Sequence, residues 1–495
     1  MHFIVKLFPE ITIKSAPVRK RFIKQLRDNL RSLFVSLNAE LEESDKIKVQ
    51  RDWDKIELTS GSNDESLRAR VSEVLAHVPG IANFALVQDY PLGDLDDIFH
   101  KTRAVYEPML VGKTFCVRVK RSGDHEFTST EVERYVGGGL NQHTQALGVK
   151  LKQPDVTVRL EIKQDRLYVI EEKINGLGGF PLGTQDPVLS LISGGFDSTV
   201  SSYLMMKRGI RAHYCFFNLG GRAHEIAVKE VAFYLWNKYG ASHKVKFVTV
   251  PFEEVVAEIL GSVQNSQMGV VLKRMMLRAA SQVAEDMSLQ ALVTGEAVGQ
   301  VSSQTLTNLT VIDEVTDALV LRPLIVMDKS DIIDIARNIG TEEFSANIPE
   351  YCGVISRKPT TRAKRDRIEA QEQNFDFEVL DKAVSDAKMV SIDDVVDDIN
   401  ADVPVEILSH AKSNSVIVDI RHPNEEELNP LVVGDQRIEK IPFYTLNSVA
   451  PTFDKAMQYL LYCDKGVMSQ LHAAHLIDQG FVNVAVYRPE KAKSE

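Results

Sequence analysis

The sequence has few cysteines and few tryptophans, with four Cys and two Trp among 495 residues. Four cysteines are too few for a disulfide framework in a chain of this length. We therefore expect them to be core residues, ligands or reactive groups in a reducing compartment. No apolar run approaches the ~20 residues of a membrane span. The first residues reach Pro9 without the apolar stretch of a secretory signal. These absences predict a cytoplasmic chain with no membrane partner, built from three or four domains at ~100–200 residues each.

Positive charge is scarce overall but is concentrated near the N-terminus. The net charge is −11, which by itself disfavours a nucleic-acid partner. Residues 1–34, however, contain eight Lys and Arg against two acids, and residues 101–125 contain six against two. Because a polyanion responds to the local field, these regions predict RNA binding, and a merely solvated helix face is the competing explanation. The residues that we expect to contact RNA are Lys20, Arg21, Arg118, Lys120 and Arg121.

The first 170 residues combine short strands with amphipathic helices. Alternating apolar residues predict a strand over 2–14, and residues 16–36 have apolar side chains at helical spacing. Residues 129–147 predict a helix that three consecutive glycines interrupt. Strand patterns at 156–162 and 166–171 predict a pair of strands. This region is therefore expected to be α+β and to form two small domains.

The pattern changes after the glycine-rich residues 175–183. Short apolar runs, beginning with 188–193, alternate with helical segments as far as 291–294. This βα alternation predicts a doubly wound parallel sheet, so the whole chain is expected to be a multidomain α/β protein. Residues 376–405 have an excess of acids and predict a linker, and residues 406–495 predict a last small α/β domain.

The strongest local signal is the sequence Ser-Gly-Gly-Phe-Asp-Ser-Thr at 193–199. It follows a predicted buried strand and precedes a predicted helix. Two glycines let the backbone turn tightly and present its N–H groups to an anion, and the helix N-terminus adds a partial positive charge. The carboxylate of Asp197 suits a bridging metal better than a phosphate alone. The competing explanation, a helix cap after a glycine turn, is disfavoured by the strand–loop–helix setting.

Two other patterns do not predict a site. Gly112-Lys113-Thr114 resembles the end of a Walker A loop, but Glu107 stands where that loop needs a glycine. The 12 histidines and four cysteines form no cluster with the spacing of zinc ligands. We therefore expect no structural metal site.

Two cysteines lie in predicted loops and two in predicted strands. Cys463 lies between an apolar strand and a helix that begins near Ser469. Loop N–H groups and a helix N-terminus stabilise a thiolate, so we expect a lowered pKa and a sulfur-accepting role for Cys463. Cys352 lies in a loop marked by Pro and Gly and has basic neighbours, which predicts an accessible thiol. Cys116 and Cys215 lie in apolar strands and are expected to be core residues.

These motifs together resemble a known family. The loop at 193–199 resembles the pyrophosphate loop of the ATP pyrophosphatases, which activate an oxygen as an AMP ester. The segment around Cys463, and the strand Val416–Arg421 ending in Asp-Ile-Arg, resemble parts of rhodanese domains. With its basic N-terminal region, the whole chain resembles the ThiI family of tRNA sulfurtransferases, or 4-thiouridine synthetases, in the long form with a rhodanese extension.

The resemblance implies a domain order and a set of nucleotide contacts. The implied domains are a ferredoxin-like domain at 1–60, a THUMP RNA-binding domain at 61–166, a PP-loop ATP pyrophosphatase domain at 175–375, the acidic linker at 376–405 and a rhodanese-like domain at 406–495. The implied ATP contacts are Leu191, Ile192, Ser193, Gly194, Gly195, Ser198, Lys273, Gly295 and Gln304. Asp197 is implied to be catalytic, with Mg²⁺ accompanying ATP.

The resemblance also implies a reaction. A cysteine desulfurase loads Cys463 with a persulfide, so the chain needs no pyridoxal phosphate of its own. ATP adenylates uridine 8 of tRNA, and the persulfide sulfur then displaces AMP to give 4-thiouridine. Cys352 acts as the resolving thiol and forms a disulfide with Cys463, which a thiol reductant reopens. The family also passes sulfur to a small sulfur carrier protein for the thiazole of thiamine.

Three alternatives stay open at this point. A pyrophosphatase-type synthetase acting on a small metabolite explains the loop at 193–199 but leaves Cys463 and the basic N-terminus without a role. A non-enzymatic RNA-binding sulfur carrier is disfavoured by the intact Asp197 and Ser198. A merely structural C-terminal domain predicts that Cys463→Ser leaves thiolation unchanged.

Overall fold

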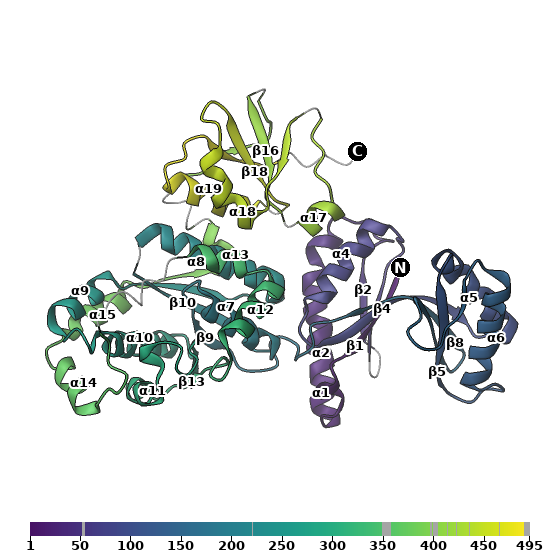
Figure 1. Ribbon diagram of the computed structural model, residues 1–495, viewed down its shortest axis with the longest axis horizontal. Coiled ribbons are helices and arrows are strands. Elements are labelled where there is room, and N and C mark those ends of the chain that lie inside the picture. The colour runs from purple at the N-terminus through teal and green to yellow at the C-terminus, as the bar shows by residue number, and fades with distance from the viewer. Residues whose placement is uncertain are drawn as a thin grey trace. The chain divides into compact units, whose positions relative to one another are not determined.

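The computed structural model describes residues 1–495 except 52–54, 220, 349–357, 397, 399–403, 413, 422, 435, 465 and 490–495. The chain divides into two compact units, unit 1 at Met1–Pro181 and unit 2 at Leu182–Glu495. Figure 1 labels their helices and strands. Over the part of the chain that is described, no helix is both long and apolar enough to cross a membrane.

Unit 1 is built on one sheet of eight strands in the order β2-β3-β1-β4-β8-β7-β5-β6. Its strands are β1 (His2–Leu7), β2 (Lys48–Arg51), β3 (Lys55–Thr59), β4 (Ile81–Pro91), β5 (Thr114–Ser122), β6 (Gly148–Val149), β7 (Val156–Lys163) and β8 (Arg166–Asn175). Its helices are α1 (Pro9–Thr12), α2 (Ala16–Leu33), α3 (Val35–Asn38), α4 (Glu65–Ala76), α5 (Leu95–Leu110) and α6 (Ser129–His143). The expected α+β class is confirmed.

The described residues of unit 1 form two large hydrophobic cores and a small third cluster of Ile4, Ala85, Val87 and Tyr168. In the first, Leu26 of α2 and Val71 of α4 pack with Val5 of β1. In the second, α5 and α6 cover β5, β7 and β8. Residues 61–85, which we expected to begin the second domain, therefore pack in the first, because the apolar face of α4 is buried there.

Two local predictions in unit 1 were wrong. Residues 9–12 form a short helix rather than the end of a strand, because Pro9 occupies its first turn, where the missing N–H costs nothing. The consecutive glycines of α6 do not interrupt that helix. A Cβ at Gly139 would lie 2.5 Å from the Phe99 ring of α5, whereas Gly138 has open space around it. Gly139 thus permits the close approach of α5 and α6.

Unit 2 begins with a six-stranded sheet in the order β13-β12-β9-β10-β11-β14. Its strands are β9 (Val188–Leu191), β10 (Ala212–Asn218), β11 (Lys246–Pro251), β12 (Ala291–Val293), β13 (Leu319–Leu321) and β14 (Lys388–Ser391). Its helices are α7 (Phe196–Lys207), α8 (Gly221–Tyr239), α9 (Glu253–Ser262), α10 (Met268–Asp286), α11 (Leu306–Asp313), α12 (Lys329–Ile339), α13 (Glu342–Asn347), α14 (Arg365–Glu372) and α15 (Phe377–Ser385). We call residues 182–396 the α/β subdomain.

The first five strands of this sheet pair in parallel, and the doubly wound prediction is confirmed. From β9 the chain builds outward through β10 and β11, and then returns to place β12 on the other side of β9. The strand order therefore reverses between β9 and β12. In open α/β sheets ligands bind in the crevice at such a reversal, beyond the carboxyl ends of the strands.

The predicted acidic linker is only partly a linker. Its first half contains α15 and β14, and β14 pairs antiparallel with β11 at the sheet edge. Leu380 and Ala383 of α15 lie in the core of the α/β subdomain, and Ile392 is fully buried. Acidic residues are so frequent in 376–405 that the amphipathic pattern of this stretch is hard to recognise. Its apolar residues nevertheless pack on the sheet.

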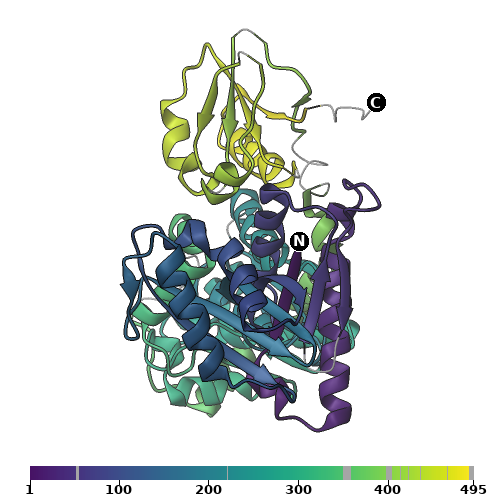
Figure 2. The ribbon, with the colours of Figure 1, turned by 90° about the vertical axis from the view of Figure 1, so that its right-hand side faces the viewer.

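A second sheet follows, which with its helices forms residues 406–489, here called the C-terminal subdomain. Its strands, all parallel, run in the order β15-β19-β18-β16-β17, and helices lie on both sides of them (Figure 2). The elements are β15 (Ile407–Leu408), β16 (Ser415–Asp419), α17 (Pro423–Leu428), β17 (Ile438–Lys440), α18 (Phe443–Val449), β18 (Gln458–Tyr462), α19 (Val467–Asp478) and β19 (Val484–Tyr487). The small α/β fold expected here is confirmed.

Candidate functional site: a phosphate-loop pocket and a buried thiol loop

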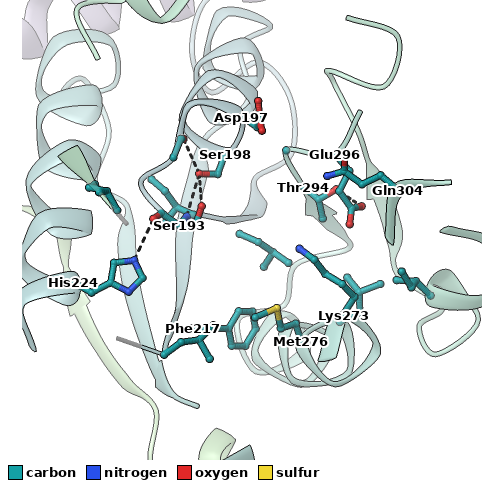
Figure 3. Close-up of a pocket in the computed structure, with 18 residues that line it drawn as sticks. Ser193, Asp197, Ser198, Phe217, His224, Lys273, Met276, Thr294, Glu296 and Gln304 are labelled. Carbon is teal, nitrogen blue, oxygen red and sulfur yellow. Dashed lines mark hydrogen bonds between the residues drawn. The ribbon is translucent and has the colours of Figure 1, made fainter. Parts of the chain in front are cut away.

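A cavity of about 190 Å³ opens at the reversal point between β9 and β12. The side chains that line it converge from the two strand ends, from α7 and from α10 (Figure 3). The lining residues include Leu191, Ile192, Ser193, Gly195, Asp197, Ser198, Lys273, Gly295 and Gln304. Every residue expected to contact ATP therefore lines this cavity, apart from Gly194.

The loop between β9 and α7 is held by its own serines. The backbone N–H of Ser193 donates to Ser198 Oγ at 3.1 Å, and Ser198 Oγ donates to the Gly195 carbonyl at 3.1 Å. These bonds fix the loop directly before the N-terminus of α7. Backbone N–H groups and the helix dipole then favour an anion in the cavity.

Two glycines allow the close packing around this loop. Gly194 has φ of +80°, in the left-handed region, and a Cβ there would lie 2.4 Å from Ile348 Cδ1. A Cβ at Gly295 would lie 2.5 Å from the backbone of Asp197. The absence of a side chain at Gly194 therefore lets the loop pack against Ile348. The absence of one at Gly295 lets the end of β12 pack against the first turn of α7.

The carboxylate of Asp197 is held by two residues far along the chain. Lys329 Nζ donates to Asp197 Oδ1 at 2.8 Å, and Gln300 Nε2 donates to Asp197 Oδ2 at 2.8 Å. Our reading of the sequence missed both partners, since nothing in the local pattern links them to the loop. Among the described residues, no group of three or more His, Cys, Asp or Glu side chains is placed to hold a metal ion.

The opposite wall of the cavity mixes apolar and polar groups. Lys273 of α10 extends into the space, beside Met276 and Phe217 (Figure 3). Gln304 is 8% exposed, and its Oε1 accepts no hydrogen bond from any described residue. Glu296 is buried and accepts a 2.8 Å bond from Arg322 Nε. The wall therefore offers an amide and a cation beside apolar surface, which suits a nucleotide.

His224 of α8 also lines the cavity and was not predicted. Its Nε2 lies 3.4 Å from the Ser193 carbonyl oxygen (Figure 3). Burial lowers the pKa of this imidazole, and the contact with Ser193 acts in the opposite direction. Burial therefore favours the neutral imidazole, which suits a hydrogen-bonding group better than a charge.

Cys463 lies in the loop between β18 and α19, as predicted. Its Sγ accepts a hydrogen bond from the Ser469 backbone N–H at 3.3 Å and lies 3.5 Å from Ser469 Oγ. Gly466 has φ of +70°, which lets the loop fold around the sulfur. The turn thus encloses the thiol with donors that would stabilise a negative sulfur.

The predicted lowering of the Cys463 pKa was wrong. Burial raises the pKa of the thiol, and this effect outweighs the hydrogen bonds from Ser469, Gly466 and Met468 that lower it. The thiol is 9% exposed. Ionisation of the Cys463 thiol therefore requires either that the loop opens or that a binding partner enters the loop.

A buried ion pair anchors the same loop. Arg421 follows β16, donates to both carboxylate oxygens of Asp419 and also donates to Asp464 Oδ1 at 2.9 Å. Its side chain is 1% exposed. This is the Asp-Ile-Arg pattern noted in the sequence, and it ties the residue after Cys463 to the end of the neighbouring strand.

The other cysteines divide as follows. Cys116 and Cys215 are buried in their strands, so the prediction that they are core residues is confirmed, and burial raises the pKa of Cys215 to about 12. Cys352 lies outside the described residues. Its accessibility and its pairing with Cys463 therefore stay predictions.

Unit 1 carries a basic groove on the sheet face opposite its helices. Two adjoining hollows there are lined by Lys6, Lys55, Arg118, Lys120, Arg121, Arg159, Lys163, Lys173 and Glu161, among others. Burial and the nearby charges of Arg159, Lys120 and Lys6 lower the pKa of Lys173. Arg118, Lys120 and Arg121, expected to contact RNA, therefore lie together. Lys20 and Arg21 lie on α2 and line neither hollow.

Three family models match successive parts of the chain. Residues 2–85 match the ThiI ferredoxin-like domain, 93–170 match the THUMP domain and 183–377 match the family described as thiamine biosynthesis protein (ThiI).

Curated relatives match along the whole length. A tRNA sulfurtransferase of Saccharophagus degradans is 57% identical over 489 residues, which cover 99% of this chain and 100% of the relative. A tRNA sulfurtransferase of Colwellia psychrerythraea is 55% identical over 490 residues, with the same coverage.

Among solved structures, a 4-thiouridine synthetase in complex with RNA and bound ATP is similar, with a TM-score of 0.68 and 24% identity. The match covers 79% of this chain and 99% of that one. A protein from Pyrococcus horikoshii gives a TM-score of 0.53 at 20% identity over 69% of this chain. At these identities the likeness establishes the fold.

Proposed function

This chain belongs to the tRNA sulfurtransferase family of enzymes, and we propose that it uses ATP to transfer a persulfide sulfur to uridine 8 of tRNA, giving 4-thiouridine. One observation carries the proposal. The residues expected to bind ATP converge on a single cavity at the reversal point of a parallel sheet, in a chain that also encloses a thiol in a donor-rich loop.

The first step is adenylation. Uridine O4 attacks the α-phosphorus of ATP, the bond between the α- and β-phosphates breaks, and pyrophosphate leaves. The N–H groups of residues 194–198 and the ammonium of Lys273 receive the charge that develops on the phosphates. Gln304 and the apolar wall hold the rest of the nucleotide. The product carries AMP on the base, which is a better leaving group than the original oxygen.

Mg²⁺ fits the site through Asp197. A carboxylate oxygen beside bound phosphates is the ligand set that Mg²⁺ prefers, because most of its other ligands are phosphate and water. Asp197 Oδ1 and Oδ2 are already oriented by Lys329 and Gln300. The ion would supply charge neutralisation on the phosphates. Lys329 and Gln300 keep the carboxylate in one orientation for it.

The second step transfers sulfur. A cysteine desulfurase supplies the outer sulfur of a Cys463 persulfide. That sulfur attacks C4 of the uridine and displaces AMP, which leaves Cys463 joined to the base through a disulfide. The Cys352 thiolate then attacks Cys463 Sγ, releasing 4-thiouridine and forming the Cys352–Cys463 disulfide. A thiol reductant supplies the two electrons that reopen it.

The basic groove of unit 1 is the proposed tRNA-binding surface, with Lys20 and Arg21 as further contacts. Its cations neutralise phosphates, so affinity should fall as salt rises. The family model that matches residues 183–377 is described by thiamine biosynthesis. It supports a second outlet for the Cys463 sulfur, a small sulfur carrier protein of thiazole synthesis.

The decisive test is thiolation of unmodified tRNA with ATP, Mg²⁺, cysteine and a cysteine desulfurase, read by mass spectrometry of digested nucleosides. Wild type should form 4-thiouridine. Cys463→Ser should form none, and Cys116→Ala, a buried thiol in unit 1, should retain activity. Formation of 4-thiouridine by Cys463→Ser would show that the C-terminal subdomain has only a structural role. ATP consumption on a small acceptor without tRNA product would favour a metabolite synthetase.

A further inference from the structure

Helix α19, which follows the Cys463 loop, packs on helix α8 of the α/β subdomain. Leu471 and Ala474 of α19 share a buried cluster with Ala232 and Phe233 of α8. A second buried cluster joins Val231 of α8 to the core of the C-terminal subdomain. We call this surface, formed by α8 and α13 against α18 and α19, the docking interface.

The docking interface encloses two titratable side chains that the proposed reaction does not use. Glu230 Oε1 of α8 lies 3.4 Å from His472 Nδ1 of α19, and the two side chains are 4% and 2% exposed. Over the described part of the chain, neither atom has a hydrogen-bond partner. The two buried polar groups face each other only when α8 and α19 pack in one register. Displacement of one helix along the other would leave each group buried against apolar side chains, which is costly.

An aromatic cluster beside this pair brings α13 into the interface. Phe344 of α13 stacks on Phe443 of α18 with ring centroids 4.9 Å apart. Tyr234 of α8 lies 5.1 Å from Phe344 and 5.5 Å from Phe443. Such pairs contribute ~0.5–1.5 kcal/mol beyond their buried area. The C-terminal subdomain therefore adds ring contacts to α13, which also packs on α7, α8 and α12 of the α/β subdomain.

The next residue of α13 contacts the phosphate loop. Ser345 Oγ donates to the Gly194 carbonyl oxygen at 2.9 Å. Ile348, one residue beyond the helix, lies against Gly194 and lines the cavity. The bond from Ser345 holds the Gly194 carbonyl on the side of α13. A shift of α13 would therefore be transmitted to the backbone of the phosphate loop.

We propose that α13 couples docking of the C-terminal subdomain to nucleotide binding, so that the docked subdomain preorganises the phosphate loop and bound nucleotide in turn favours docking. Linkage makes the two effects equal in size. The inference rests on the proposed function in one respect, that the cavity takes ATP. Its consequence is that the sulfur-carrying subdomain is held against the α/β subdomain when the nucleotide is in place.

The test uses the full chain with α,β-methylene ATP and Mg²⁺, without RNA or a sulfur donor. His472→Glu sets a second carboxylate against Glu230 and should undock the subdomain. The matched control is Val482→Glu, which adds the same charge at a 96% exposed position between α19 and β19. The swapped pair, Glu230→His with His472→Glu, restores one carboxyl group and one imidazole at the contact. Small-angle X-ray scattering reports docking, and titration calorimetry reports nucleotide affinity.

We expect His472→Glu to raise the radius of gyration and to weaken analogue binding at least about fivefold. Val482→Glu should match wild type, and the swapped pair should recover both properties. If His472→Glu fails to fold, Phe344→Leu, which keeps the apolar volume but removes the ring stack, should shift both readouts in the same direction.

Two results would overturn the inference. An undocked variant that binds the analogue as tightly as wild type would show that α13 transmits nothing. A variant that stays compact would show that the Glu230–His472 contact does not hold the interface. Absence of analogue binding by wild type would instead overturn the proposed nucleotide site itself, and the inference with it.

Discussion

At residue scale, the two adjacent glycines of the phosphate loop differ in what they tolerate. Gly194 has φ of +80° and no room for a Cβ, whereas Gly195 has φ of −69° and its nearest neighbour would lie 3.6 Å from an added Cβ. Gly194→Ala should cost about 1–3 kcal/mol of unfolding free energy and weaken binding of an ATP analogue, as measured by calorimetry. Gly195→Ala should cost well under half as much stability. Equal stability losses would contradict the steric explanation.

The thiol of Cys463 should ionise later than an ordinary cysteine, because burial raises its pKa. In a Cys352→Ser background, iodoacetamide alkylation of Cys463 followed by mass spectrometry should show a midpoint above pH 9. Ser469→Ala removes the hydroxyl at 3.5 Å and should move the midpoint higher, while the backbone N–H stays. A midpoint below that of a free thiol would show that the loop donors outweigh burial.

Much of the candidate site was predictable because its chemistry is local. The loop at 193–199 and the Cys463 turn are continuous stretches with glycines and donors at fixed spacing. The partners of Asp197 were not predictable, since Lys329 and Gln300 lie 132 and 103 residues away from it. The pKa of Cys463 was predicted in the wrong direction for a related reason. Loop donors are visible in the sequence, whereas burial is a property of the folded neighbours.

At the scale of elements, helix α6 offers a matched pair of glycines. Gly138 has open space around it, but a Cβ at Gly139 would lie 2.5 Å from the Phe99 ring. Gly138→Ala should stabilise unit 1 by about 0.5–1 kcal/mol, because alanine favours the helix. Gly139→Ala should destabilise it, because the ring must move or α5 must separate from α6. Thermal unfolding of both variants checks the sign, and a stabilised Gly139→Ala would contradict the close packing.

Element type was predictable where periodicity extends over many residues, as in α2, α10 and the strands of the parallel sheet. It failed where composition concealed the pattern. The acids of 376–405 predicted a linker, yet Leu380 and Ala383 provide the apolar stripe by which α15 packs. Pro9 ended a strand that alternation would have continued. Edge elements such as β14 depend on a partner strand, which a local pattern does not reveal.

At the scale of the whole molecule, the pair at the docking interface predicts a pH dependence. Burial raises the pKa of Glu230 from 4.5 to about 8 and lowers that of His472 from 6.5 to about 3. The contribution of Glu230 to stability is complete below pH 4.5 and is lost as pH rises to about 8, at about 1.4 kcal/mol per pH unit. His472 acts in the opposite sense between pH 3 and 6.5, and buried His475 on the same helix also has a lowered pKa.

Glu230→Gln isolates the carboxyl group, because both histidines remain. The melting temperature of wild type should fall relative to Glu230→Gln as pH rises from about 4.5 to about 8, and the difference should be constant above that range. Parallel melting curves across this window would show that Glu230 keeps its ordinary pKa, and hence that the interface is open to water.

The packing of α15 and β14 has a consequence for the geometry of sulfur delivery. Since residues up to Val396 pack in the α/β subdomain and Asp398 pairs with Lys229 of α8, the connection to Glu406 is seven residues, 399–405, rather than thirty. Seven residues span at most ~25 Å. Cys463 and the rest of the C-terminal subdomain therefore stay within a short radius of the α/β subdomain, at an effective concentration in the millimolar range. Under the proposed function, sulfur delivery is then an intramolecular event, which dilution of the enzyme cannot slow.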